Sequence, residues 1–112
     1  MVTTDELQDQ SLQVLAQVVR LLCRCTDLAF AGAVPGEELA ALGLGAQLLA
    51  DEAMHLLPTT ADVDEIVVGY DDPVQALRAA EALTRRVPIE AFPAGASQLI
   101  VGICDLIREH PA

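Results

Sequence analysis

The sequence predicts an all-α protein, a compact helical bundle of four longer helices plus one short helix. The apolar residues, 53% of the chain, are mostly Ala and Leu, which lead the helix propensity ranking. β-branched residues form only one short cluster, Ile66-Val67-Val68. Apolar positions recur at helical spacing in segments that Gly and Pro separate. A chain of 112 residues is expected to form a single domain, residues 1–112, with one core that needs no disulfide.

The first helix is expected from about Thr4 to about Phe30. Thr3 and Glu6 have the spacing of a capping box at its start. A narrow polar stripe runs along it, and nearly every other position is apolar. So wide an apolar face exceeds what one neighbouring helix can cover. We therefore expect either that several helices pack around it or that part of it contacts a second copy of the chain.

A second helix is expected from about Gly36 to Leu57, because Pro35-Gly36 breaks the pattern before it and Pro58 follows it. Its apolar residues have heptad-like spacing. Gly43 and Gly45 are small, so they predict a close approach by a neighbouring backbone. 

Residues 61–70 match two patterns. Ile66-Val67-Val68 is typical of a strand, whereas Val63, Ile66, Val67 and Tyr70 have the i, i+3, i+4, i+7 spacing of a helix. A lone strand would lack a partner elsewhere in this chain. We therefore predict the short helix here, ended by Gly69.

Two further helices complete the bundle. Asp72-Pro73 reads as an N-cap followed by Pro at the first helical position, and this helix is expected to continue to about Val87. Glu81 and Arg85 have the spacing of an i, i+4 ion pair. Residues 88–93, with Pro at both ends, are expected to be an extended connector. The last helix is expected from about Ala94 to Glu109, and its segment from 99 to 104 is apolar all round, which predicts a central, buried helix.

Net negative charge is concentrated in the middle of the chain. The formal net charge is −11, and the stretch from Cys25 to Leu77 contains ten carboxylates and no Lys or Arg. Such a field attracts cationic partners. The candidate partner-binding residues are the carboxylates that follow the second helix: Asp62, Asp64, Glu65, Asp71 and Asp72.

Composition argues against several functional classes. Six Arg residues without a basic stripe, together with few aromatic residues, disfavour nucleic-acid binding. The longest near-apolar run, residues 39–50, is too short to span a membrane. The first residues lack the pattern of a signal peptide, so a cytoplasmic location is expected. The absence of Lys and Asn indicates a GC-rich bacterial genome.

Glu52 and His55 form an E-x-x-H spacing that could place two metal ligands on one helix face. Di-iron bundles use this motif twice, and the second copy is missing here. We therefore expect no metal or other cofactor, with Glu52 and His55 as the weak candidates for ligands. The alternative for His55 is a favourable position near the negative end of its helix.

The three cysteines are expected to be free thiols. Cys23 and Cys25 would project about 200° apart on a helix, so they cannot hold one metal ion. Cys25 and Cys104 are expected to be core thiols. Nothing in the sequence marks any of the three as a catalytic nucleophile.

These observations favour a non-catalytic interaction protein that binds a basic protein partner, as an inhibitor, immunity-type protein or adaptor would. The chain is more consistent with a binding protein than with an enzyme, and a homodimer is expected from its wide apolar faces. The alternative is a helical bundle that binds a small molecule or a metal, as an accessory protein or enzyme of a bacterial biosynthetic pathway, centred on Glu52 and His55.

Overall fold

The computed structural model describes residues 4–32, 38–57 and 70–110, and within these ranges it contains helices and no strand. The elements are α1 (Thr4–Gly32), α2 (Glu38–Leu56), α3 (Pro73–Thr84), the 3-10 turn η1 (Ile89–Ala91) and α4 (Ala96–Glu109). The predicted all-α bundle of four longer helices is therefore confirmed. The short helix predicted over residues 61–70, and Thr3 of the predicted capping box, lie outside the described residues.

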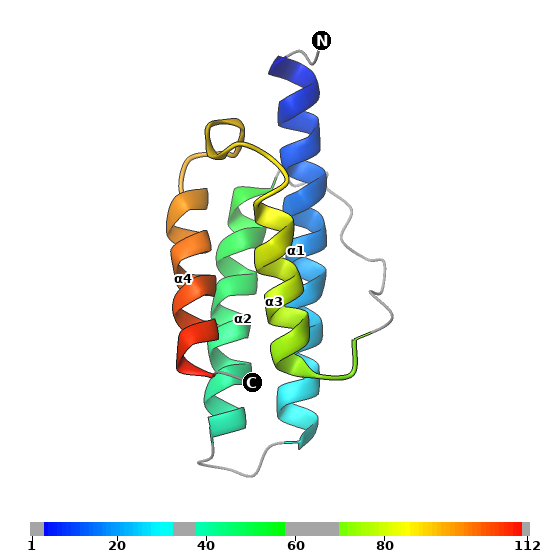
Figure 1. Ribbon diagram of the computed structural model, residues 1–112, viewed down its shortest axis with the longest axis vertical. Helices are drawn as coiled ribbons and strands as arrows, with labels where there is room; N and C mark the ends of the chain where they lie inside the picture. Colours follow the sequence, from blue (N-terminus) through cyan, green and yellow to red (C-terminus); the bar gives the residue numbers. More distant parts are fainter. Residues whose placement is uncertain (1–3, 33–37, 58–69, 111–112) are drawn as a thin grey trace.

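The four helices run along the long axis of the bundle (Figure 1), and their contacts place them at the corners of a square. α1 packs against α2 and α3, and α4 packs against the same two helices, so α1 and α4 lie at opposite corners. The colours in Figure 1 show that α2 and α3 both run antiparallel to α1, whereas α4 runs parallel to it. Each pair of adjacent helices is therefore antiparallel. The α1/α2 face and the α3/α4 face lie on opposite sides of the bundle.

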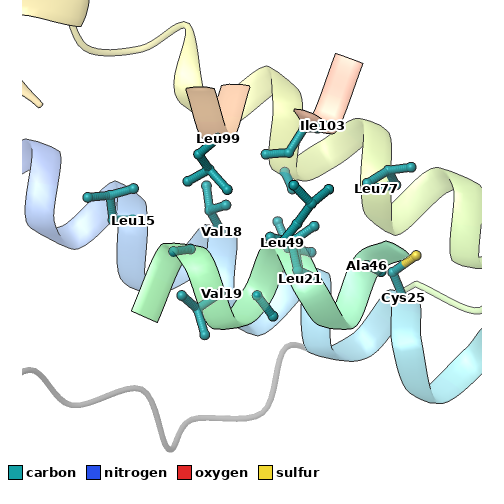
Figure 2. Packing of buried hydrophobic residues seen from close by; sticks show 14 of the residues in the cluster. Leu15, Val18, Val19, Leu21, Cys25, Ala46, Leu49, Leu77, Leu99 and Ile103 are labelled. Atoms are coloured by element: carbon teal, nitrogen blue, oxygen red, sulfur yellow. The ribbon is translucent and has the colours of Figure 1, made fainter. Parts of the chain in front are cut away.

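α1 supplies the largest share of the core. Val18, Leu22, Cys25 and Ala29 have no exposed surface. Figure 2 shows α1 side chains meeting Ala46 and other residues from the facing helices. Burying one large aliphatic side chain contributes about 1.5–3 kcal/mol. The expectation that several helices pack around this face is confirmed, because α2 covers one side of it and α3 the other.

Glycine allows α2 and α4 to pack closely. A Cβ atom on Gly45 would lie 2.8 Å from Leu106 Cδ1, and one on Gly102 would lie 2.6 Å from Leu49 Cδ2. Each leucine thus fills the space that the opposite glycine leaves. The close approach predicted at Gly45 is present, although a leucine side chain makes it rather than a neighbouring backbone.

The prediction that α4 is central and buried all round is wrong. Leu99 and Ile103 are fully buried, but Val101 is 56% exposed, and Ile100 and Cys104 are half-buried. α4 packs against α2 and α3 less extensively than α1 does, and its outward side faces solvent. An apolar composition does not by itself place a side chain in the core, because soluble proteins expose much apolar surface.

The connector between α3 and α4 also differs from the prediction. α3 ends at Thr84, earlier than the expected Val87, and α4 begins at Ala96 rather than Ala94. Between them the chain is not fully extended: the N–H of Ala91 donates to the Pro88 carbonyl at 2.9 Å, which forms η1. This turn brings Phe92, only 8% exposed, back onto the core.

The N-terminus of α3 matches its prediction. Asp72 Oδ1 accepts hydrogen bonds from the backbone N–H groups of Val74 at 2.8 Å and Gln75 at 3.1 Å. Pro73 occupies the first helical position, where the missing N–H costs nothing. The N-cap therefore satisfies two of the otherwise unpaired donors at this helix end.

Replacing the cap separates its structural role from its charge. We expect Asp72→Ala to lower the free energy of unfolding by about 1 kcal/mol, the usual cost of losing an N-cap. Asp71→Ala is the matched control, since it removes the neighbouring exposed carboxylate, and it should change stability by less than about 0.5 kcal/mol. Urea denaturation measures both values. Equal losses for the two variants would contradict the capping role.

Candidate functional site in the groove between α1 and α2

The structure describes two of the five predicted partner-binding carboxylates. Asp71 and Asp72 are both exposed, at the start of α3. They lie beside the C-terminal half of α1, because Arg24 Nε donates to the Tyr70 carbonyl at 3.1 Å. Asp62, Asp64 and Glu65 lie outside the described residues, so the acidic surface proposed from the sequence is placed only in part.

A groove of about 400 Å³ runs between α1 and α2, a size within the range of binding sites. Residues spaced three and four apart on each helix line it, as expected for two helix edges that face each other. The lining residues are Cys23, Thr26, Asp27, Phe30, Gln47, Ala50, Asp51 and Met54. None of these eight is Lys or Arg, so the groove contains two carboxylates and no basic side chain of its own.

Sequence reasoning did not connect Asp27 with Asp51, since they belong to different helices. Each carboxylate is followed three residues later by an exposed apolar side chain: Phe30 is 44% exposed and Met54 is 48% exposed. This repeated spacing of a carboxylate and an apolar residue is the feature of the sequence that could have indicated the groove. Because α1 and α2 pack antiparallel, the two pairs of residues line the same groove in opposite directions.

The register follows from Phe30, whose ring lies over Gly43; a Cβ on that glycine would be 3.0 Å from the ring. Since the helices are antiparallel, residues that precede Phe30 on α1 lie beside residues that follow Gly43 on α2. Phe30 is therefore at one end of the groove and Met54 is at the other. Asp27 and Asp51 lie between them. The groove therefore has an acidic middle and apolar ends.

The Cys23 thiol reports the electrostatics of this acidic middle. Its pKa is raised above the ordinary value of 9.0, first by partial burial and then by the negative charges of Asp27 and Asp51. Asp27 and Asp51 line the groove together with Cys23, and a nearby anion disfavours the thiolate. The two carboxylates, one from each helix, therefore both raise the pKa of the Cys23 thiol.

The other two cysteines have different surroundings. Cys25 is fully buried, and burial together with the charge of Asp72 raises its pKa to about 12, so it is protonated and inert at neutral pH. Between pH 9 and 12 the unfolded chain would ionise this thiol while the folded chain would not, so stability falls as pH rises through that range. The expectation that Cys104 is a core thiol is wrong: it is half-buried at the surface between α3 and α4.

Glu52 and His55 lie near the end of α2, adjacent to the groove. Glu52 is half-buried and His55 is exposed. His55 Nδ1 lies 2.7 Å from the Asp51 carbonyl, which can only accept, so this nitrogen carries the proton and Nε2 remains available. Among the described residues, no three His, Cys, Asp or Glu side chains lie close enough together to hold a metal ion. The expectation of no bound metal, with Glu52 and His55 as the weak candidates for ligands, stays a prediction.

Neutralising the two groove carboxylates tests this electrostatic description. In a Cys104→Ser background, we expect Asp27→Asn with Asp51→Asn to lower the pKa of Cys23, because the anions that oppose thiolate formation are gone. The rate of Cys23 alkylation as a function of pH measures the pKa. Glu90→Gln with Glu109→Gln removes the same charge from exposed sites elsewhere and should leave the curve in place. An unshifted curve in the groove variant would contradict the assigned geometry.

Comparison of the chain with protein-family models, with curated proteins and with solved structures gave no match. No helix in the described ranges is both long and apolar enough to cross a membrane. The groove between α1 and α2, with its two carboxylates and exposed apolar ends, is therefore the basis for a functional assignment.

Proposed function

We propose that this protein is a non-catalytic interaction module that binds a basic protein partner through the groove between α1 and α2. The observation that carries this proposal is the placement of Asp27 and Asp51 between exposed Phe30 and Met54. An amphipathic segment with a cationic centre complements that arrangement. An inhibitor, immunity-type protein or adaptor of the bacterial cytoplasm would use such a surface.

Both charge and apolar area support a protein partner over a free cation. An exposed ion pair alone contributes only about 0.2–1 kcal/mol, so two carboxylates on an open surface give weak binding. A partner side chain that also covers Phe30 and Met54 would remove apolar surface from water and partly desolvate the ion pair. A guanidinium placed against the Phe30 ring would add a cation–π contact. Binding energy and selectivity for Arg then come from the same few residues.

The acidic middle of the chain would extend this surface. Asp71 and Asp72 lie beside the same half of α1, and the proposal includes Asp62, Asp64 and Glu65 as further carboxylates of the partner-binding region. With a net charge of −11, long-range attraction would speed the approach of a basic partner. Neither Asp27 nor Asp51 has its charge balanced by a basic residue within the groove.

We also propose a homodimer, but its support now comes from a different surface than the one that the sequence suggested. The apolar face of α1 that motivated it packs inside the bundle. The exposed leucines of α2 are now its best support: Leu44 is 55% exposed and Leu48 is 62% exposed, one helical turn apart. 

A synthetic amphipathic helix with Arg on one face and Leu on the other is a suitable probe for the groove. We expect Asp27→Asn with Asp51→Asn to weaken its binding about tenfold, which corresponds to about 1.4 kcal/mol. Binding is measured by calorimetric titration at low and at high ionic strength, and it should weaken as salt rises. Thermal unfolding of each variant shows whether the fold is retained.

The control is Glu90→Gln with Glu109→Gln, which changes net charge equally at sites outside the groove. If this variant weakens binding as much as the groove variant does, the attraction comes from overall charge and the groove is not the site. Absence of binding to the unmodified protein would also refute the proposal. Asp71→Asn, tested separately, shows whether the acidic region beyond the groove contributes.

A further inference from the structure

A second groove lies between α3 and α4, on the face opposite the acidic groove. Its volume is about 510 Å³. The lining residues are Arg78, Glu81, Arg85, Cys104, Ile107 and Arg108. Three of the six arginines in a protein of net charge −11 thus gather around one groove.

The predicted pair between Glu81 and Arg85 is present, at 2.7 Å. Arg108 pairs with Asp105 outside the lining. The side chains of Arg85 and Arg108 are 76% and 74% exposed, so both pairs are weak and water-screened. Arg78 is exposed and has no hydrogen bond or ion pair with another residue in the described part of the chain. Glu81, 14% exposed, is the one carboxylate in the lining, and Arg85 already neutralises it.

The antiparallel register sets where the arginines lie. Cys104 Sγ lies 4.0 Å from Glu81 Oε1, so these two residues face each other. Arg78 lies three residues before Glu81, and Arg108 lies four residues after Cys104. On antiparallel helices both steps lead in the same direction, so Arg78 and Arg108 lie at the same end. Arg85 lies toward the other end, about 10 Å along α3 from Arg78.

We propose that this groove binds a carboxylate carried on an aliphatic chain. The carboxylate would lie between Arg78 and Arg108, and the chain would lie along Ile107 and Cys104 toward Arg85. Guanidinium groups match a carboxylate through paired N–H donors. Ile107 and Cys104 offer an apolar floor, which a small inorganic anion would not use. This site goes beyond the proposed function, since it has the opposite charge preference and lies on the opposite face.

A small amphipathic molecule fits the observations better than an acidic protein segment. The groove volume is within the usual range for small-ligand sites, about 300–1,000 Å³. Two arginines at one end suit the charged head of such a ligand, and the apolar floor beside them suits its aliphatic tail. An extended acidic surface would instead require basic residues spread along the helices, and Arg86, the next arginine, lines a different groove.

The test uses dodecanoate as the probe, below its micelle concentration. We expect dodecanoate to bind and Arg78→Gln to weaken binding about tenfold, measured by calorimetry. Arg86→Gln is the matched control, since it removes an exposed arginine outside this groove, and it should change binding little. 1-Dodecanol and acetate, which lack the charge and the chain respectively, should both bind more weakly than dodecanoate.

Alkylation of the two accessible thiols locates the bound molecule. Dodecanoate should protect Cys104, which lines this groove, and leave Cys23, on the opposite face, unprotected. Equal weakening by Arg78→Gln and Arg86→Gln would overturn the proposal, as would equal binding of dodecanol. Protection of Cys23 instead of Cys104 would overturn it even if dodecanoate binds.

Discussion

The wide apolar face of α1 is the constraint on which the rest of the bundle depends. One helix could not cover it, and α2 and α3 therefore pack on its two sides. α2 and α3 both run antiparallel to α1, and the apolar surface between them on the side away from α1 is covered by α4. Leu99 and Ile103 are the fully buried α4 side chains at this contact. The reciprocal leucine and glycine contacts between α2 and α4 then set how closely this last helix can approach.

The square arrangement also determines where charge can lie. The core is almost entirely apolar, so the ionisable groups lie outside it, many of them along the edges where helices meet. The edge between α1 and α2 receives Asp27 and Asp51, and the opposite edge, between α3 and α4, receives Arg78, Arg85 and Arg108. The bundle thus presents an acidic groove and an arginine-lined groove on opposite faces, each with one partly accessible thiol. Folding does not require two carboxylates without a basic neighbour among the described residues of the acidic groove, nor Arg78 without a carboxylate partner in the other groove, which supports binding roles for both.

Local signals predicted much of the fold. The Asp72-Pro73 cap, the Glu81–Arg85 pair and the starts and ends of the helices depend on residues near one another in sequence, and the structure agrees closely with most of them. The burial of α4 could not be predicted this way, because Val101 is as apolar as its buried neighbours and only the packing of the other helices decides which side faces water. The turn at η1 forms because Phe92 reaches the core, which is again a tertiary effect.

The candidate site shows the same limit. The acidic character of the middle of the chain is visible in the sequence, but the pairing of Asp27 with Asp51 requires the register between α1 and α2. The sequence does contain a repeated spacing, an Asp followed three residues later by an apolar residue. That spacing indicates a shared groove only when α1 and α2 are known to pack antiparallel. Cys104 was misplaced for the same reason as Val101. Glu52 and His55 were correctly placed on one helix, and their chemistry stays a prediction.

Native-state hydrogen exchange tests most directly the claim that α1 is the element on which the bundle depends. Amides in the buried middle of α1, around Val18 and Leu22, should exchange slowest and only through global unfolding, because α1 packs against α2 and α3 far more extensively than α4 does. Amides of α4 should exchange faster, through openings that leave α1 in place. If α4 exchanges as slowly as the middle of α1, or more slowly, the central role of α1 is contradicted.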